Sequence, residues 1–328
     1  MCARWTSERR QTKGRLSLSE LHSRSTIAPD RYSTAGSASR IWTLITEPMG
    51  KFCRRPVYEE FDVCEMSMSW FLAARSRGEP VIGLPIFPLR MPVLAYMFCR
   101  ADAPYRHPRD LIGCTIATPG FHYTVNLWLR GLLQEHYGLS PEQMTWITGA
   151  QEGAGYLIPA GITWRLEAAK TPEELLIAGE ADAVFSPGRP LSVQQGDGRI
   201  RRLLPDPALE QASLFRESGT NPITHIMVTS ERLARTYPGV AASLLDGFRS
   251  AQRLVDDFQA EPKNLSFPEA VFLIETTWRT YGTDLWSHGL TAANRRTLET
   301  FIRYAHEQGY VAERPSLDSL FPENTLDM

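Results

Sequence analysis

The sequence predicts an α/β protein in which a mainly parallel sheet carries helices on both faces. From residue 56 onwards, short apolar runs bounded by proline and glycine alternate with segments of helical periodicity. Capping boxes with proline at the first helical position begin at Ser140 and Thr171. Two long extended segments, near 92–102 and 222–230, bracket the middle of the chain and are candidates for strands that cross into a second lobe and back. This order of elements is typical of βαβ units.

Residues 1–45 differ from the rest of the chain in composition. They are rich in arginine and serine, poor in acidic residues, and show no sustained period. The composition overlaps that of organellar transit peptides, but it favours a disordered tail or a mis-assigned start of the reading frame. No apolar core of a secretory signal is present in this sequence, because charged residues recur between Trp5 and Ala28.

The first patterned stretch is "EFDVCEMSMSWFLAARSRG", residues 60–78. Glu65, Ser67 and Ser69 alternate with large apolar residues, as in an extended strand. From Trp70 the apolar residues follow helical spacing to the end of the stretch. The pattern therefore predicts a strand that runs directly into a helix through a row of polar side chains.

Further elements follow in regular order. Apolar extended runs at 80–88 and 92–102 precede a short buried strand at 113–120, which Pro-Gly closes. The later predicted elements are a helix over 121–138, a capping box at 140–143, a helix over 171–179, a buried strand at 181–187, an extended run at 223–231, a long amphipathic helix over 240–258 with Leu245, Leu254 and Phe258 on its apolar side, and a last helix at 294–309.

Composition limits the function classes. With 43% hydrophobic and 22% charged residues, a chain of 328 residues is an ordinary globular protein of one or two domains. Residues 1–55 hold 11 Lys+Arg against 4 Asp+Glu, whereas the remainder holds 24 against 33. An acidic body argues against binding to nucleic acid or to a membrane surface. No apolar run approaches the roughly 18 residues that a membrane span needs.

The five cysteines show no paired spacing for disulfides or zinc. We therefore expect reduced thiols and a cytoplasmic protein. The histidines of "HPRD" and "HEQG" stand without a metal partner at helical spacing, so no metal site is predicted. The chain also lacks the phosphate-binding glycine motifs, the HExxH zinc motif and the GxSxG nucleophile elbow.

Polar side chains follow three of the predicted strands. They lie at Glu65–Ser69, Thr118–Thr124 and Ser186–Arg189. Helix N-termini after strands offer free N–H groups that favour anions. Arg90 follows another strand, and Arg130 lies in the helix after Thr124. Together these groups would suit a carboxylate ligand.

Each candidate also has a purely structural interpretation. Ser67 or Ser69 would serve as an ordinary N-cap, as Thr171 and Ser140 do. Arg130 would lie on a solvated helix face, and Ser186 before proline would form a turn. His225, within an apolar strand, is typical of a core histidine. Glu65 is harder to assign to structure alone, because a carboxylate among buried neighbours must be paired or protonated.

Several motifs together resemble the 4,5-dihydroxyphthalate decarboxylase family. They are "FDVCEMSMSWFLAARSRG", "GLPIFPLRM", "AGEADAVFSP", "RRLLPD", "NPITHIMVTSE" and "NRRTLETFIRYAHEQG", in the order and spacing of that family over residues 46–322. The resemblance implies a two-lobed type 2 periplasmic-binding-protein-like fold with two crossing strands as a hinge and a ligand between the lobes. Lobe 1 would comprise 46–98 plus 226–328, and lobe 2 would comprise 99–225.

The resemblance also implies a function and a site. It implies decarboxylation of a hydroxylated aromatic dicarboxylate, of the type that converts 4,5-dihydroxyphthalate to protocatechuate. The implied site residues are Glu65, Ser67, Ser69, Arg90, Tyr123, Thr124, Arg130, Ser186, Arg189 and His225. In the mechanism we expect, Arg90 with Arg130 or Arg189 anchors the carboxylates. His225 or a protonated Glu65 delivers the proton to the ring carbon.

Two alternatives remain open. In the first, the chain is a binding protein without catalytic activity, which presents a small carboxylate to a transporter. In the second, it is the product of a degenerate gene and folds poorly. The expected partner is a small aromatic carboxylate, and no binding to nucleic acid or to a membrane is expected. Whether the chain associates into a homo-oligomer is left open. No cofactor is implied, and a requirement for a divalent metal is also left open.

Overall fold

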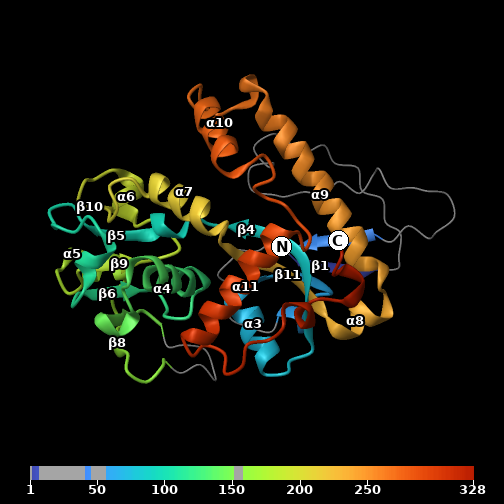
Figure 1. The fold of residues 1–328 in the computed structure, drawn as a ribbon, viewed down its shortest axis with the longest axis horizontal. Coiled ribbons are helices and arrows are strands. Elements are labelled where there is room, and N and C mark those ends of the chain that lie inside the picture. Colours follow the sequence, from blue (N-terminus) through green and yellow to red (C-terminus); the bar gives the residue numbers. More distant parts are fainter. Residues whose placement is uncertain (1, 7–40, 46–56, 151–157) are drawn as a thin grey trace. The chain divides into compact units, whose positions relative to one another are not determined.

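The computed structural model describes residues 2–6, 41–45, 57–150 and 158–328 (Figure 1). Contacts divide the chain into two compact units. Unit 1 comprises Met1–Pro88, His225–Asn294 and Ser316–Met328, and unit 2 comprises Leu89–Thr224 and Arg295–Pro315. Each unit contains one sheet, and each is described by itself.

Unit 1 is built on a five-stranded sheet. Its order is β2-β1-β3-β11-β4, with β2 at Ile41–Ile45, β1 at Cys2–Thr6, β3 at Val63–Ser67, β11 at Ile223–Ser230 and β4 at Val81–Arg90. β1 pairs antiparallel with both β2 and β3, and β11 pairs antiparallel with β3. The prediction of mainly parallel sheets is therefore wrong for this unit. Apolar periodicity identifies a strand but not its partner, and β3 and β11 are too far apart in sequence for a βαβ rule to apply.

Helices cover both faces of this sheet. Leu84 and Ile86 of β4 pack with Leu245 of helix α9 (Gly239–Ala260). Gly83, which directly precedes Leu84, faces the other way, where an added Cβ would meet Phe71 of helix α3 (Met68–Ser76) at 3.0 Å. Successive strand residues point to opposite faces, so α9 and α3 lie on opposite sides of β4.

The N-terminal segment contributes strands to the sheet. The sequence predicts disorder over 1–45, whereas β1 and β2 form a ladder in which Cys2 pairs with Ile45 and Thr6 with Ile41. That prediction is wrong for these two strands, because ladder hydrogen bonds with β3 order a segment whose own sequence has no period. Residues 7–40 lie outside the described residues.

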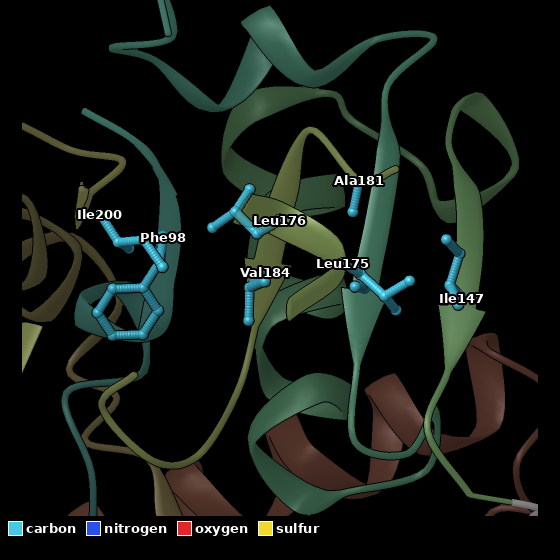
Figure 2. Close-up of a cluster of buried hydrophobic side chains, with 8 residues drawn as sticks. Phe98, Ile147, Leu175, Leu176, Ala181, Val184 and Ile200 are labelled. Atoms are coloured by element: carbon cyan, nitrogen blue, oxygen red, sulfur yellow. The ribbon is translucent and has the colours of Figure 1, made fainter. Parts of the chain in front are cut away.

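Unit 2 contains a six-stranded mixed sheet. Its order is β10-β5-β9-β6-β7-β8, with β10 at Ile200–Arg202, β5 at Met97–Arg100, β9 at Ala183–Phe185, β6 at Thr115–Thr118, β7 at Thr145–Thr148 and β8 at Thr163–Leu166. β9, β6, β7 and β8 run parallel, as predicted, and β5 pairs antiparallel with β9 and β10. Helix α5 (Pro172–Ile177) lies on one face, where Leu175 and Leu176 close a buried cluster (Figure 2).

The opposite face of this sheet carries helix α4 (Thr124–Tyr137). Ile147 faces α5, so the preceding Trp146 faces the other way, where its ring meets Phe121 at 5.2 Å. Helix α11 (Ala292–Glu307) packs on α4 so closely that a Cβ on Gly131 would lie 2.2 Å from the Tyr304 ring. Glycine is required at this crossing.

Two strands carry the chain across the boundary between the units. The boundary falls at Pro88/Leu89 in β4 and at Thr224/His225 in β11. The second of the predicted crossing segments, 222–230, coincides with β11. The first, 92–102, does not, because it forms a 3-10 turn (Val93–Tyr96) and β5 within unit 2.

The remaining helices are α2 (Val57–Glu60), α6 (Leu191–Gln195), α7 (Pro207–Ser218), α8 (Glu231–Thr236) and α10 (Ala270–Tyr281). Unit 2 also takes in part of α11 and the residues after it, Arg295–Pro315, which the sequence assigns to lobe 1. In the described part of the chain, no helix is long and apolar enough to span a bilayer.

Candidate functional site

The polar row at the start of α3 is the first part of the candidate site. β3 ends at Ser67, and α3 begins at Met68 rather than at Trp70. Ser67 occupies the N-cap position, but its hydroxyl makes no cap hydrogen bond; its Oγ lies 3.2 Å from Oγ of Ser69. Both serines are buried. The N-cap interpretation is thus wrong for the Ser67 side chain, which joins a local polar cluster instead.

Glu65 and His225 form the centre of this cluster. His225 Nδ1 lies 2.6 Å from Glu65 Oε1, and the two side chains are 10% and 17% exposed. In the antiparallel ladder His225 stands opposite Ser67, and Met227 stands opposite Glu65. Glu65 on β3 therefore reaches diagonally to His225 on the neighbouring strand β11, a distance that long side chains span. The structure brings four predicted site residues together: Glu65, Ser67, Ser69 and His225.

The face of the sheet beneath α9 is apolar at one end of β3 and polar at the other end. Val63 and Met227 belong to the buried cluster beneath α9. Two residues further along β3, on the same face, stands Glu65, and Ser67 follows at the strand end. The same alternation that buries an apolar side chain at one end of the strand therefore presents a carboxylate and a hydroxyl at the other.

The Glu65 carboxyl is ionised at neutral pH. Burial raises its pKa, but the hydrogen bond and the positive charge of His225 are among the stronger opposing causes, and the pKa falls to about 2. The lowered pKa favours the carboxylate form of Glu65 at neutral pH, and which of His225 and Glu65 delivers a proton stays a prediction. An ionised carboxylate accepts a hydrogen bond from Nδ1–H and so holds the imidazole in the tautomer whose Nε2 faces away from the pair.

Helix α4 carries three predicted site residues of unit 2. Tyr123 is the N-cap residue, without a side-chain cap bond, and Thr124 is the buried first residue of the helix. Arg130 is not on a solvated face: it is buried, donating from Nη1 to the carbonyl of Phe121 at 2.7 Å. Its guanidinium carbon lies 3.8 Å from the centroid of the Phe121 ring.

The other predicted residues of unit 2 lie at loops and strand ends. Arg90 ends β4 and donates from Nη1 to the carbonyl of Asn221 at 3.3 Å. The Ser186 hydroxyl accepts from the backbone N–H of Gly188 at 3.3 Å, the turn that its sequence context indicates. Arg189 is exposed. Their roles toward a substrate stay predictions.

Sequence reasoning missed Gln308, which holds Arg130 in place. The Gln308 side-chain oxygen accepts from Arg130 Nε at 2.8 Å, and its Nε2 donates to the carbonyl of Leu127 at 2.9 Å. Gln308 lies in the quoted motif "HEQG", but nothing local in that motif indicates a partner so distant in sequence. Among the described residues, no group of three or more His, Cys, Asp or Glu could hold a metal ion.

Solved structures define the class of fold. The chain resembles the periplasmic aliphatic sulphonate binding protein SsuA from Escherichia coli, at 16% identity and a TM-score of 0.50, over 82% of each chain. It also resembles a periplasmic sulfonate-binding protein SsuA from Methylobacillus flagellatus, at 12% identity and a TM-score of 0.52, over 82% of this chain and 74% of that one. The chain has a periplasmic-binding-protein-like α/β fold, which confirms the predicted class.

Curated relatives define the family. A 4,5-dihydroxyphthalate decarboxylase of Pseudomonas putida is 31% identical over 181 residues, covering 53% of this chain and 70% of the relative. One of Comamonas testosteroni is 27% identical over 296 residues, covering 87% and 89%. No protein-family model matches the chain. The chain belongs to the 4,5-dihydroxyphthalate decarboxylase family, as its motifs predict.

Proposed function

We propose that this protein decarboxylates a hydroxylated aromatic dicarboxylate, of the 4,5-dihydroxyphthalate type, with His225 as the proton carrier. The observation that carries the proposal is the buried pair of His225 and the ionised Glu65. Both relatives reported above are decarboxylases by name. Decarboxylation replaces a carboxylate by hydrogen, so the protein must supply one proton at one carbon.

The reaction needs few protein groups. A ring hydroxyl para to the departing carboxylate raises the electron density at the ring carbon to which this carboxylate is attached. His225, protonated on both nitrogens, gives its Nε2 proton to that carbon. The bond from the ring to the carboxylate then breaks, its electron pair restores the aromatic ring, and CO2 leaves. Glu65 is a positioning residue, since it holds Nδ1 and stabilises the imidazolium that must form again before the next turnover.

The arginines and hydroxyls support substrate binding in this proposal. Carboxylates of the substrate would be held by Arg90 with Arg130 or Arg189, and by hydroxyls at the starts of α3 and α4. We also propose a cytoplasmic location, where thiols such as those of Cys99 and Cys114 stay reduced. Cell fractionation with an antibody to the chain tests the location, and recovery with periplasmic markers would refute it.

Turnover of 4,5-dihydroxyphthalate tests the chemistry. Purified protein should release CO2 and protocatechuate in equal amounts, and in D2O the product should carry one deuterium at the carbon that lost its carboxylate. His225→Asn should lower kcat by about 100- to 10,000-fold, the usual contribution of a general acid. Glu65→Gln should lower kcat with little change in KM, because it acts through His225.

The matched control is another buried histidine of unit 1. His288 Nδ1 accepts from the backbone N–H of Phe87 at 3.1 Å, and an asparagine side-chain oxygen can take that bond. His288→Asn should therefore leave turnover within about twofold of the wild type, since no proton transfer is assigned to it. Full activity of His225→Asn would remove the assigned role. Thermal stabilisation by the diacid without any product would instead identify a binding protein without chemistry.

A further inference from the structure

Arg130 has its contacts inside unit 2. Only 1% of its surface is exposed, so very little of the side chain is open to a substrate. Nη1 donates to the carbonyl of Phe121 at 2.7 Å, and Nε donates to Gln308 Oε1 at 2.8 Å. The guanidinium carbon lies 3.8 Å from the centroid of the Phe121 ring, which covers one face of the group. The side chain therefore connects α4 with the turn before it and with the residue that follows α11.

These contacts form a closed chain of hydrogen bonds. Gln308 Nε2 donates to the carbonyl of Leu127 at 2.9 Å, and the N–H of Leu127 donates to the carbonyl of Tyr123 at 3.0 Å. The chain thus leads from Phe121 through Arg130 and Gln308 back to Tyr123, two residues after its start. Rotation of the peptide that follows Phe121 would break it. We refer to the two side chains in the middle as the Arg130–Gln308 link.

The link holds the turn at residues 119–123, which connects β6 to α4. A second side chain of α4 holds the same turn, because Asn126 Nδ2 donates to the carbonyl of Gly120 at 2.7 Å. Two successive peptides of the turn are thus fixed from α4, one by Asn126 and one by Arg130. Two residues predicted to bind the substrate, Tyr123 and Thr124, come at the end of this turn and at the start of the helix.

The two residue types of the link suit this role. Guanidinium is a planar group that donates in several fixed directions, so one arginine reaches both a carbonyl and an amide oxygen, whereas lysine has no such fork. Glutamine carries an acceptor and a donor on one amide, so Gln308 accepts from Arg130 and donates to Leu127. Glutamate would keep only the acceptor, and methionine of similar length would keep neither.

We propose that Arg130 and Gln308 are positioning residues for substrate binding, which hold the turn before α4 without touching the substrate. Arg189, rather than Arg130, then joins Arg90 in holding the carboxylates. The inference rests on the proposed function, because the turn matters to turnover only if its residues bind the substrate. Without the link the turn samples further orientations, and the affinity falls with the fraction of molecules in the binding orientation. The proton transfer by His225 is unaffected.

Hydrogen exchange of the substrate-free protein tests the link directly. Gln308→Met should speed amide exchange at residues 120–124 by roughly 10- to 100-fold, because the turn opens more often. Tyr304→Phe is the matched control. It removes a hydrogen bond between the same two helices, from the Tyr304 hydroxyl to Glu135 at the other end of α4. This control should lower the melting temperature and leave exchange in the turn at the rate of the wild type.

Steady-state kinetics test the effect on the substrate. Gln308→Met and Arg130→Met should each raise KM by about tenfold and leave kcat within about threefold, as expected when binding alone is weakened. The double variant should be no worse than Arg130→Met, because both changes release the same carbonyl. Tyr304→Phe should keep the KM of the wild type. A link with a merely structural role would lower the melting temperature of Gln308→Met without changing its KM.

The outcomes separate this inference from the proposed function. An Arg130→Met variant whose KM rises about 100-fold, while exchange in the turn stays unchanged, would identify Arg130 as a direct ligand and overturn the proposal. Additive effects of the two substitutions on KM would overturn it as well. A wild type without turnover would refute the decarboxylase proposal alone. The affinity for the diacid would then replace KM, and unchanged exchange in Gln308→Met would still refute the link.

Discussion

The pair of Glu65 and His225 predicts a pH-dependent part of the stability that Glu65→Gln should remove. The pKa of the carboxyl falls from 4.5 to about 2 on folding. One pKa unit corresponds to about 1.4 kcal/mol, so the shift is worth about 3 kcal/mol. A lowered pKa means that the unfolded chain binds the proton more tightly. The stabilisation is thus complete above about pH 5 and is lost as the pH falls through about 2.

Urea unfolding of the wild type and of Glu65→Gln measures this contribution. The difference between their unfolding free energies should shrink by about 2 kcal/mol between pH 7 and pH 3. Following both tryptophan fluorescence and circular dichroism checks that the transition is two-state, since the chain has two units. In a His225→Asn background, Glu65→Gln should show a smaller change with pH, because the hydrogen bond and the charge of His225, the strongest causes that lower the pKa, are gone.

A glutamate of the same unit provides the control. Glu59 is exposed in α2, and the difference between the wild type and Glu59→Gln over the same pH range is the baseline for the measurement. A difference for Glu65→Gln that changes no more than this baseline would refute the reasoning. It would mean that the short contact to His225 does not favour the carboxylate over the acid.

Four further substitutions test the packing and a helix cap. Gly131→Ala should destabilise the protein by about 1–3 kcal/mol, seen as a lower melting temperature, because its Cβ would meet the Tyr304 ring at 2.2 Å; Gly247→Ala in α9, with nothing within 4 Å, should instead stabilise it by up to about 1 kcal/mol. Thr171→Ala should cost about 1 kcal/mol in urea unfolding, since its hydroxyl accepts a hydrogen bond from the N–H of Glu174 in the first turn of α5. Leu175→Ala should cost about 2–5 kcal/mol by opening a cavity in the buried cluster, and a loss below 1 kcal/mol would contradict the packing in Figure 2.

The start of α3 shows what the sequence can predict and where it stops. Alternation identifies the strand at Val63–Ser67, and helical spacing identifies the helix after it. The helix begins at Met68, before the predicted start at Trp70, because a period of 2 and a period of 3.6 fit equally well over the few residues from Met68. Such patterns cannot identify His225 as the partner of Glu65, because this contact depends on the register between β3 and β11.

The long helix α9 shows a different limit. Its apolar side is continuous in sequence, and a single buried face is the natural prediction. In the structure Leu245 is buried while Leu254 and Phe258 are exposed. Periodicity reports which residues share a face, but the length of sheet available to cover that face is a tertiary property. The formation of β1 and β2 is likewise a tertiary property, because β1 pairs with β3 and β2 pairs with β1.

The ladder between β3 and β11 also restricts how genes of this family can change in length. Inserting or deleting one residue between His225 and Met227, or between Val63 and Glu65, would turn the histidine or the carboxylate to the opposite face, where Cys64 and Ile226 are buried. Loops beyond the ladder carry no such penalty. Across related genes, gaps should therefore be absent from these two short strands, even where sequence identity is low.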